Sequence, residues 1–198
     1  MATFLECNVR HKKMFAEILS KVVRENGHLD ILCNNAGIGP SSNDVENMVC
    51  VNLVSVIEGT LLATKIMDKN NGGRGGCIVN IASTAGLFYF PASNCAYLAS
   101  KHGVVSFTRA YAKVAMKSGV RINCICPSFV DTDMSRTSAL LIPEVKQQQQ
   151  ALGVQTVDDV AKGFIQLLNV EDKVGEAMRI SFKNGIEYHT FPPDPILL

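Results

Sequence analysis

The sequence has 198 residues, a length typical of one domain, and we interpret residues 1–198 as a single domain. Hydrophobic residues make up 47% and charged residues 19% of the sequence, which favours a packed core and excludes a disordered chain. The formal net charge is +1, and no basic run is longer than a pair such as Lys12-Lys13. We therefore expect neither nucleic acid nor an anionic membrane surface as a partner.

Uncharged stretches and cysteines indicate the compartment. The longest uncharged stretch, Gly75 to Ser100, is interrupted by polar residues and prolines, so no membrane span is expected. Met1 to Lys13 contains no apolar run after a basic start, so no secretory signal is predicted. The seven cysteines are odd in number and include no C-x-x-C pair. We interpret them as reduced thiols of a cytoplasmic protein, in preference to disulfides or a metal site.

The first part of the chain alternates strand and helix patterns. Phe4 to Val9 reads as a strand, and His11 to Asn26 has the apolar spacing of an amphipathic helix. Leu29 to Cys33 has the length of a strand and runs into the turn residues Asn34 to Gly37. A long helix is predicted over Val45 to Met67.

The second part continues this alternation. Its first predicted element is a buried strand, which is followed by a loop and then by further helices and strands. Residues 132–152 are interpreted as part of a mobile segment, and Thr156 with Asp159 resembles a capping box that starts a helix. The other predicted elements are the strand Cys77 to Ile81, the loop Ala82 to Cys95, the helix Ala96 to Lys117, the strand Val120 to Cys126 and the last strand Ala177 to Phe182.

Alternating strands and helices predict an α/β fold, a doubly wound parallel sheet with helices on both faces. In such sheets ligands bind beyond the carboxyl ends of the strands. Three polar clusters directly follow predicted strands: Asn34 to Gly37, Ser83, and Pro127 to Thr132. We therefore expect these clusters to form one pocket.

Tyr97 and Lys101 are four residues apart on a predicted helix, so they share one face. A tyrosine has an ordinary pKa of about 10, too high for a base at neutral pH. A nearby ammonium group lowers that pKa, so Tyr97 becomes a candidate acid or base for an alcohol proton. Alone, the pair is weak evidence, and a chance pairing on the helix surface explains it better.

Ser83 and Asn52 extend this candidate site. Ser83 follows a buried strand, where its hydroxyl would bind a substrate oxygen beside Tyr97; the alternative is an ordinary loop serine. Asn52 is polar within an apolar helical stretch, and the alternative is a core amide with its hydrogen bonds satisfied.

Together these residues resemble the short-chain dehydrogenase/reductase family. Order and spacing match from Asn34 to Thr132, about half of the chain, and this match is very specific. The matching positions are the N-N-A-G motif at Asn34-Asn35-Ala36-Gly37, the catalytic set Asn52, Ser83, Tyr97 and Lys101, the proline Pro127 and the threonine Thr132.

The resemblance implies a Rossmann-like fold and an NAD-dependent oxidoreductase. The substrate would be a lipid-like secondary alcohol such as the 15-hydroxyl of a prostaglandin, with Ser83 and Asn94 holding its oxygen. Asn52 would hold a water in the proton path. The residues implied in NAD binding are Cys7, Asn8 and Val9 at the adenine end, Asn35, Tyr97 and Lys101 at the ribose, and Val130, Asp131 and Thr132 at the nicotinamide.

One part of the family pattern is absent from this sequence. The glycine-rich turn T-G-x-x-x-G-x-G and two strand–helix units have no counterpart, so we expect an N-terminally truncated sheet with a hole at its centre. Two alternatives stay open: a related enzyme for another lipid-like alcohol or carbonyl, such as a steroid or retinoid, or a catalytically silent truncated product. The resemblance also implies a homodimer formed by the helices Val45 to Met67 and Ala96 to Lys117.

Overall fold

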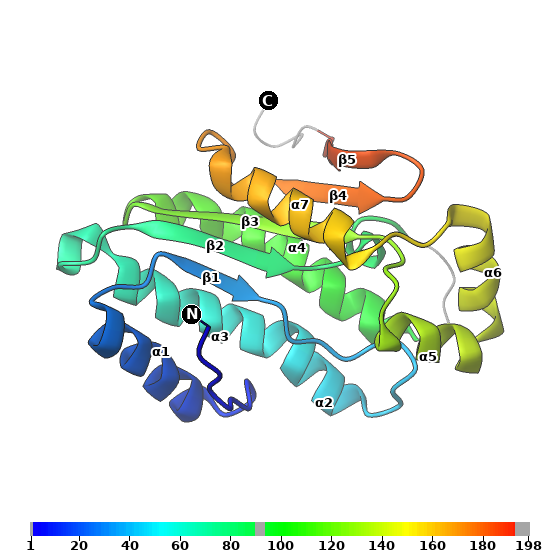
Figure 1. Cartoon of the computed structure of the whole chain (residues 1–198), viewed down its shortest axis with the longest axis horizontal. Coiled ribbons are helices and arrows are strands. Elements are labelled where there is room, and N and C mark those ends of the chain that lie inside the picture. Colours follow the sequence, from blue (N-terminus) through cyan, green and yellow to red (C-terminus); the bar gives the residue numbers. More distant parts are fainter. Residues whose placement is uncertain (1, 90–93, 193–198) are drawn as a thin grey trace.

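The computed structural model describes residues 2–89 and 94–192 and contains a five-stranded sheet of order β1-β2-β3-β4-β5. The first four strands are parallel, and β5 turns back antiparallel to β4. Figure 1 shows the sheet with helices in front and behind. The strands are β1 (Ile31–Asn34), β2 (Gly76–Ile81), β3 (Val120–Pro127), β4 (Ala177–Ser181) and β5 (Gly185–Tyr188).

Helices cover both faces of this sheet. α1, α3 and α4 pack on one face and α7 packs on the other, so the predicted doubly wound, Rossmann-like α/β class is confirmed. Three short helices, one of π type (Cys50–Val54) and two of 3-10 type (Lys69–Asn71 and Thr84–Gly86), link the longer elements. The α-helices are α1 (Lys12–Asn26), α2 (Val45–Val49), α3 (Ser55–Met67), α4 (Cys95–Met116), α5 (Asp133–Leu141), α6 (Pro143–Leu152) and α7 (Val157–Asn169).

The apolar sequence of β2 follows from this double cover. Successive side chains of a strand point to opposite faces, so both faces must be apolar when both are covered. Ile78 packs with α1, α3 and α4, whereas Cys77 and Val79 pack with Leu167 of α7. Leu167 is fully buried, and its replacement by alanine is expected to cost about 2–5 kcal/mol of stability.

The prediction of a strand over Phe4 to Val9 is wrong. These residues form no strand; Cys7 and Val9 instead pack against the core cluster that contains Phe15 and Leu19 of α1. The expected hole is also absent, because the sheet of the described residues runs without interruption from β1, its outermost strand, to β5. A strand forms only where it has a partner for its backbone groups, and no neighbouring strand reaches this segment.

The long helix predicted over Val45–Met67 is present, but it is interrupted by the π-helical turn Cys50–Val54. By length and composition alone, this stretch is apolar enough to cross a membrane. In the structure it packs beside α4 and the sheet, and seven residues of α3 are buried. It therefore serves here as a core helix.

The C-terminal third contains elements that the sequence analysis did not assign. Helices α5 and α6 occupy most of the segment interpreted as mobile. Strand β5 forms a hairpin with β4, and Gly185 has a φ of 67°, a left-handed conformation that favours glycine. The dipeptide Asn184-Gly185 is a strong hairpin signal and would have predicted this turn.

Candidate active site

A cavity of about 790 Å³ lies at the carboxyl ends of β1, β2 and β3, where the three polar clusters were expected to meet. It is bounded on its other sides by residues of α4, α5, α6 and α7. The sequence-predicted site residues that line it are Asn35, Ser83, Asn94, Tyr97, Lys101, Val130 and Thr132. The structure therefore brings these residues together in one place.

The loop after β1 is anchored by a buried polar network. Asn34 donates from Nδ2 to Asn80 Oδ1 at 2.8 Å and to Thr60 Oγ1 at 3.1 Å. Asn80 in turn donates from Nδ2 to Thr108 Oγ1 at 3.0 Å. These bonds join β1, α3, β2 and α4, so Asn34 holds the loop in place while the neighbouring Asn35 faces the cavity.

Asn52 lies in the π-helical turn and is fully buried. Its Oδ1 accepts from the backbone N–H of Ile38 at 2.7 Å, and its Nδ2 donates to Ile38 O at 2.9 Å. The same Nδ2 lies 3.4 Å from Ser100 Oγ on α4. Asn52 does not line the cavity; it fixes the loop at Ile38, which does. A π-turn in a helix often marks a functional site, and here it carries this anchor.

Ser83 and Tyr97 form the centre of the site. Ser83 caps the short 3-10 helix after β2, and its Oγ accepts from the backbone N–H of Ala85 at 3.1 Å. Its side chain also makes a hydrogen bond with Tyr97. Burial raises the pKa of Tyr97, and the Ser83 hydrogen bond opposes this rise only in part. The expected lowering of the Tyr97 pKa is therefore not found.

The surroundings of Lys101 explain why its ammonium group does not lower the pKa of Tyr97. It is buried, its Nζ lies 5.9 Å from the centroid of the Tyr97 ring, and it donates to Ile81 O at 3.0 Å. Burial lowers the pKa of Lys101 to about 8, with a small opposing contribution from Cys126. The amine is thus still mostly protonated at pH 7, but desolvation by burial is the largest cause of the pKa shift of both groups.

Asn94 caps the N-terminus of α4. Its Oδ1 accepts from the backbone N–H of Tyr97 at 3.0 Å, and its Nδ2 donates to Pro40 O at 3.0 Å and to Ser42 O at 2.8 Å. Both N–H groups of the amide are therefore used to tie the loop at Pro40 to α4. A substrate hydroxyl can reach only the remaining lone pair of Oδ1.

The residues expected at the adenine end of the cofactor are not at the cavity. Cys7 and Val9 pack into the core, and Asn8 Oδ1 accepts from the backbone N–H of Arg10 at 3.1 Å. Asp131 also lies outside the cavity, where it pairs with Arg136. The structure therefore separates these four residues from the seven that meet at the strand ends.

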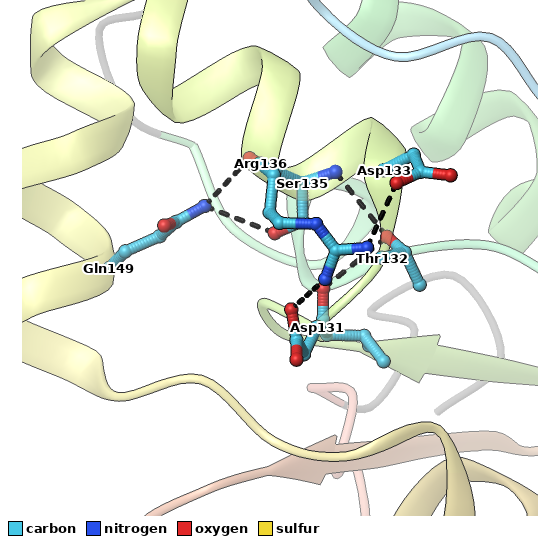
Figure 2. A network of polar contacts seen from close by, with 7 residues as sticks. Asp131, Thr132, Asp133, Ser135, Arg136 and Gln149 are labelled. Carbon is cyan, nitrogen blue, oxygen red and sulfur yellow. Dashed lines mark hydrogen bonds and ion pairs between the residues drawn. The ribbon is translucent and has the colours of Figure 1, made fainter.

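Helices α5 and α6 are joined by polar contacts above the cavity (Figure 2). Thr132 caps α5 through the N–H of Ser135 at 3.3 Å, and Gln149 of α6 donates from Nε2 to Ser135 O at 3.1 Å and to Ser135 Oγ at 3.0 Å. Arg136 pairs with Asp131 and with Asp133. These contacts hold the two helices as one wall.

Helices α5, α6 and α7 contribute lining residues that the sequence analysis missed. They follow helical spacing along each helix, which could have identified one face of each. From α5 to α7 they are Met134, Ser135, Ser138, Ile142, Glu144, Val145, Gln148, Gln149, Val157, Val160, Ala161 and Phe164. Seven of these twelve residues are apolar, including all four from α7, so this side of the cavity suits the chain of a lipid-like molecule.

The residues present fit the nicotinamide end of a dinucleotide. Asn35, Lys101 and Thr132 supply an amide, an amine and a hydroxyl to one cavity, and such groups suit a ribose and a carboxamide. The glycine-rich turn that holds a pyrophosphate does not occur in the sequence. The fit is thus local to the reacting end of such a cofactor.

Comparisons with known proteins agree with this geometry. The family pattern described as short chain dehydrogenase matches residues 1–140. The chain is 40% identical to the mouse (Mus musculus) 15-hydroxyprostaglandin dehydrogenase [NAD(+)] over 98% of this chain and 76% of that protein. It is 38% identical to the human (Homo sapiens) protein of the same name over 97% and 76%. The solved structure of ElxO with NADP bound superposes with a TM-score of 0.76 at 28% identity, covering 89% of this chain and 75% of that one.

Proposed function

Because this chain belongs to the short-chain dehydrogenase family, we propose that it oxidises a secondary alcohol of a lipid-like substrate, with NAD as the hydride acceptor. The observation that supports this most directly is the grouping of Ser83, Tyr97 and Lys101 in one otherwise largely apolar cavity. The prostaglandin 15-hydroxyl is the specific substrate that we propose, because relatives named for that reaction are similar to nearly the whole chain.

In the proposed reaction the substrate alcohol lies beside Tyr97. Tyr97 would act as the phenolate: it first releases its own proton to solvent and then takes the hydroxyl proton, while Ser83, which is hydrogen-bonded to Tyr97, holds the same oxygen. Lys101 faces the same space and, when protonated, stabilises the phenolate. Asn52 and Asn94 act one step away, since they hold the loops at Ile38 and Pro40 that shape the site.

Residues Asn35, Lys101, Val130 and Thr132 are proposed to hold the nicotinamide end of the cofactor. A nicotinamide held there would supply the acceptor for the hydride that leaves the alcohol carbon. We propose NAD rather than NADP because the similar mouse and human proteins are named for NAD, although ElxO was solved with NADP. Comparing NAD with NADP as oxidant in the same assay tests this choice.

The test is NADH production, followed by absorbance, with a prostaglandin and with a steroid alcohol. We expect turnover of the prostaglandin, and a Tyr97→Phe variant that loses at least about 10²-fold in rate because it lacks only the hydroxyl. Tyr111→Phe is a matched control, since Tyr111 stacks on Phe107 and does not line the cavity. Near-full turnover by Tyr97→Phe would show the acid–base assignment to be wrong.

A second candidate function is a chain that binds lipid alcohols without oxidising them. One observation favours it: Cys7, Asn8 and Val9, expected at the adenine end, lie away from the cavity. Lipid binding without NADH production, at saturating NAD and NADP, would select this candidate over the first.

A further inference from the structure

We propose that the cavity accepts a lipid whose far end is neutral and discriminates against a free carboxylate there, with Glu144 as the residue that sets this specificity. The inference rests on the proposed function and narrows its substrate class: the preferred substrate carries the same alcohol as a prostaglandin, but its carboxyl end is esterified or amidated, and the free acid is the weaker ligand. A lipid alcohol offers two ends to the protein: the hydroxyl that reacts and the opposite end of the chain. The charges that line the cavity differ between these two ends.

Only two described lining residues carry a formal charge at neutral pH, Lys101 and Glu144. Lys101 lies at the reacting end, where its Nζ is bonded to Ile81 O and is close to Tyr97. Glu144 comes from α6, which stands beyond the carboxyl ends of the strands (Figure 1). A substrate that presents its alcohol to Tyr97 therefore meets an acidic group, and no lining cation, along the α6 wall.

Basic residues near this wall are not available to a carboxylate. Arg136, the basic residue of α5, is bound to Asp131 and Asp133, as Figure 2 shows. Lys146 of α6 is exposed and does not line the cavity. The wall thus lacks the arginine or lysine that usually recognises a carboxylate.

The N-terminus of α6 does not compensate for this lack. Free N–H groups in the first turn of a helix attract anions. Glu144 is the second residue of α6, so its own carboxylate already occupies this favourable position. A substrate carboxylate brought to the same place would meet a like charge.

Gln148 indicates what the wall can bind instead. It lies one helical turn after Glu144 and lines the cavity, and its side-chain amide makes no hydrogen bond with the described part of the chain, whereas the Gln149 side chain is bonded to Ser135. A carboxylate accepts hydrogen bonds, and a free amide both donates and accepts them. Together Glu144 and Gln148 suit a hydroxyl or an amide N–H. The far end of the substrate is therefore that of a glyceryl ester or an amide.

The test uses binding, which does not depend on the cofactor. The probes are a prostaglandin with a free carboxyl group and its glyceryl ester, each titrated into the wild-type chain at pH 7 by calorimetry. Both keep the alcohol that is proposed to lie beside Tyr97 and Lys101, so the two probes differ only at the far end. We expect the ester to bind about threefold to tenfold more tightly, as expected for one partly screened like-charge contact. Raising the ionic strength from about 0.01 M to about 1 M should narrow this difference, because salt screens exposed charges.

Variants locate the effect at Glu144. Glu144→Gln should tighten binding of the acid by the same factor and leave the ester unchanged, and Glu144→Lys should make the acid the tighter ligand. Glu46→Gln is the matched control, since Glu46 is an exposed residue of α2 outside the cavity. Equal binding of acid and ester, unchanged in Glu144→Gln, would overturn this inference alone. If neither probe binds, the proposed lipid substrate falls as well.

Discussion

Asn52→Ala is predicted to destabilise the whole chain by releasing the loop at Ile38. The substitution removes two hydrogen bonds, at 2.7 Å and 2.9 Å, that satisfy the N–H and C=O of Ile38. A buried group left without its partner costs about 1–3 kcal/mol. Ile38 lines the cavity, so water can reach it in part and the cost lies towards the lower end of this range. With the small void left by the amide, we expect a loss of about 2–4 kcal/mol.

Urea unfolding followed by circular dichroism measures this loss. With a slope of about 2 kcal/mol per M, the midpoint should fall by about 1–2 M. Asn26→Ala is the matched control, because Asn26 is exposed and its Nδ2 makes one bond, to Val22 O at 2.9 Å. We expect this control to shift the midpoint by less than half as much. Equal midpoints for Asn52→Ala and wild type would refute the assignment of Asn52 as the anchor of this loop.

Protonation, assembly and cofactor binding offer three further measurements. Burial lowers the pKa of Lys101 from 10.5 to about 8, so between these pH values the unfolded chain binds one more proton than the folded chain. The free energy of unfolding of the wild type relative to Lys101→Met should therefore rise by about 3 kcal/mol from pH 8 to pH 10.5, as measured in unfolding titrations. A pH-independent difference would contradict this. The homodimer that we propose would use α3 and α4, where Leu61 and Val114 are exposed. Leu61→Glu should then shift sedimentation towards monomer, whereas Lys13→Glu, at an exposed residue of α1 outside the proposed interface, should not; an unshifted Leu61→Glu would exclude this interface. Calorimetry should show that residues 1–198 bind NAD far more weakly than the mouse relative, because no glycine-rich turn holds the pyrophosphate; equal affinity would disprove this.

Local patterns predicted the elements whose environment repeats along the chain. β2, β3 and α4 were predicted within about one or two residues, because strands buried on both faces and a long capped helix leave clear sequence patterns. Phe4 to Val9 has an equally strand-like pattern but forms none, since pairing depends on a neighbour distant in sequence. The grouping of Ser83, Tyr97 and Lys101 was predicted from the place of Ser83 after a strand, the spacing of Tyr97 and Lys101 on one helix, and the family resemblance taken together.

Features set by burial and by long-range packing could not be predicted in this way. The pKa of Tyr97 depends on how completely the ring is enclosed, and a spacing of four residues to Lys101 says nothing about enclosure. Asn94 was expected to hold substrate, but its partners Pro40 and Ser42 lie about fifty positions away in the chain. The proposed role of Glu144 likewise depends on the position of α6 beside the cavity, which no local sequence pattern indicates.

The buried ladder of Asn34, Thr60, Asn80 and Thr108 constrains how this protein can change over evolutionary time. Each of the four side chains makes a hydrogen bond to at least one of the others, so a single apolar replacement leaves a buried polar group without its partner. Simultaneous replacement of all four by apolar residues of similar size removes that penalty. Chains with only some of the four residues replaced are less stable than chains with all four polar or all four apolar. We therefore expect lineages of this fold to retain the four polar residues as a block or to exchange them as a block.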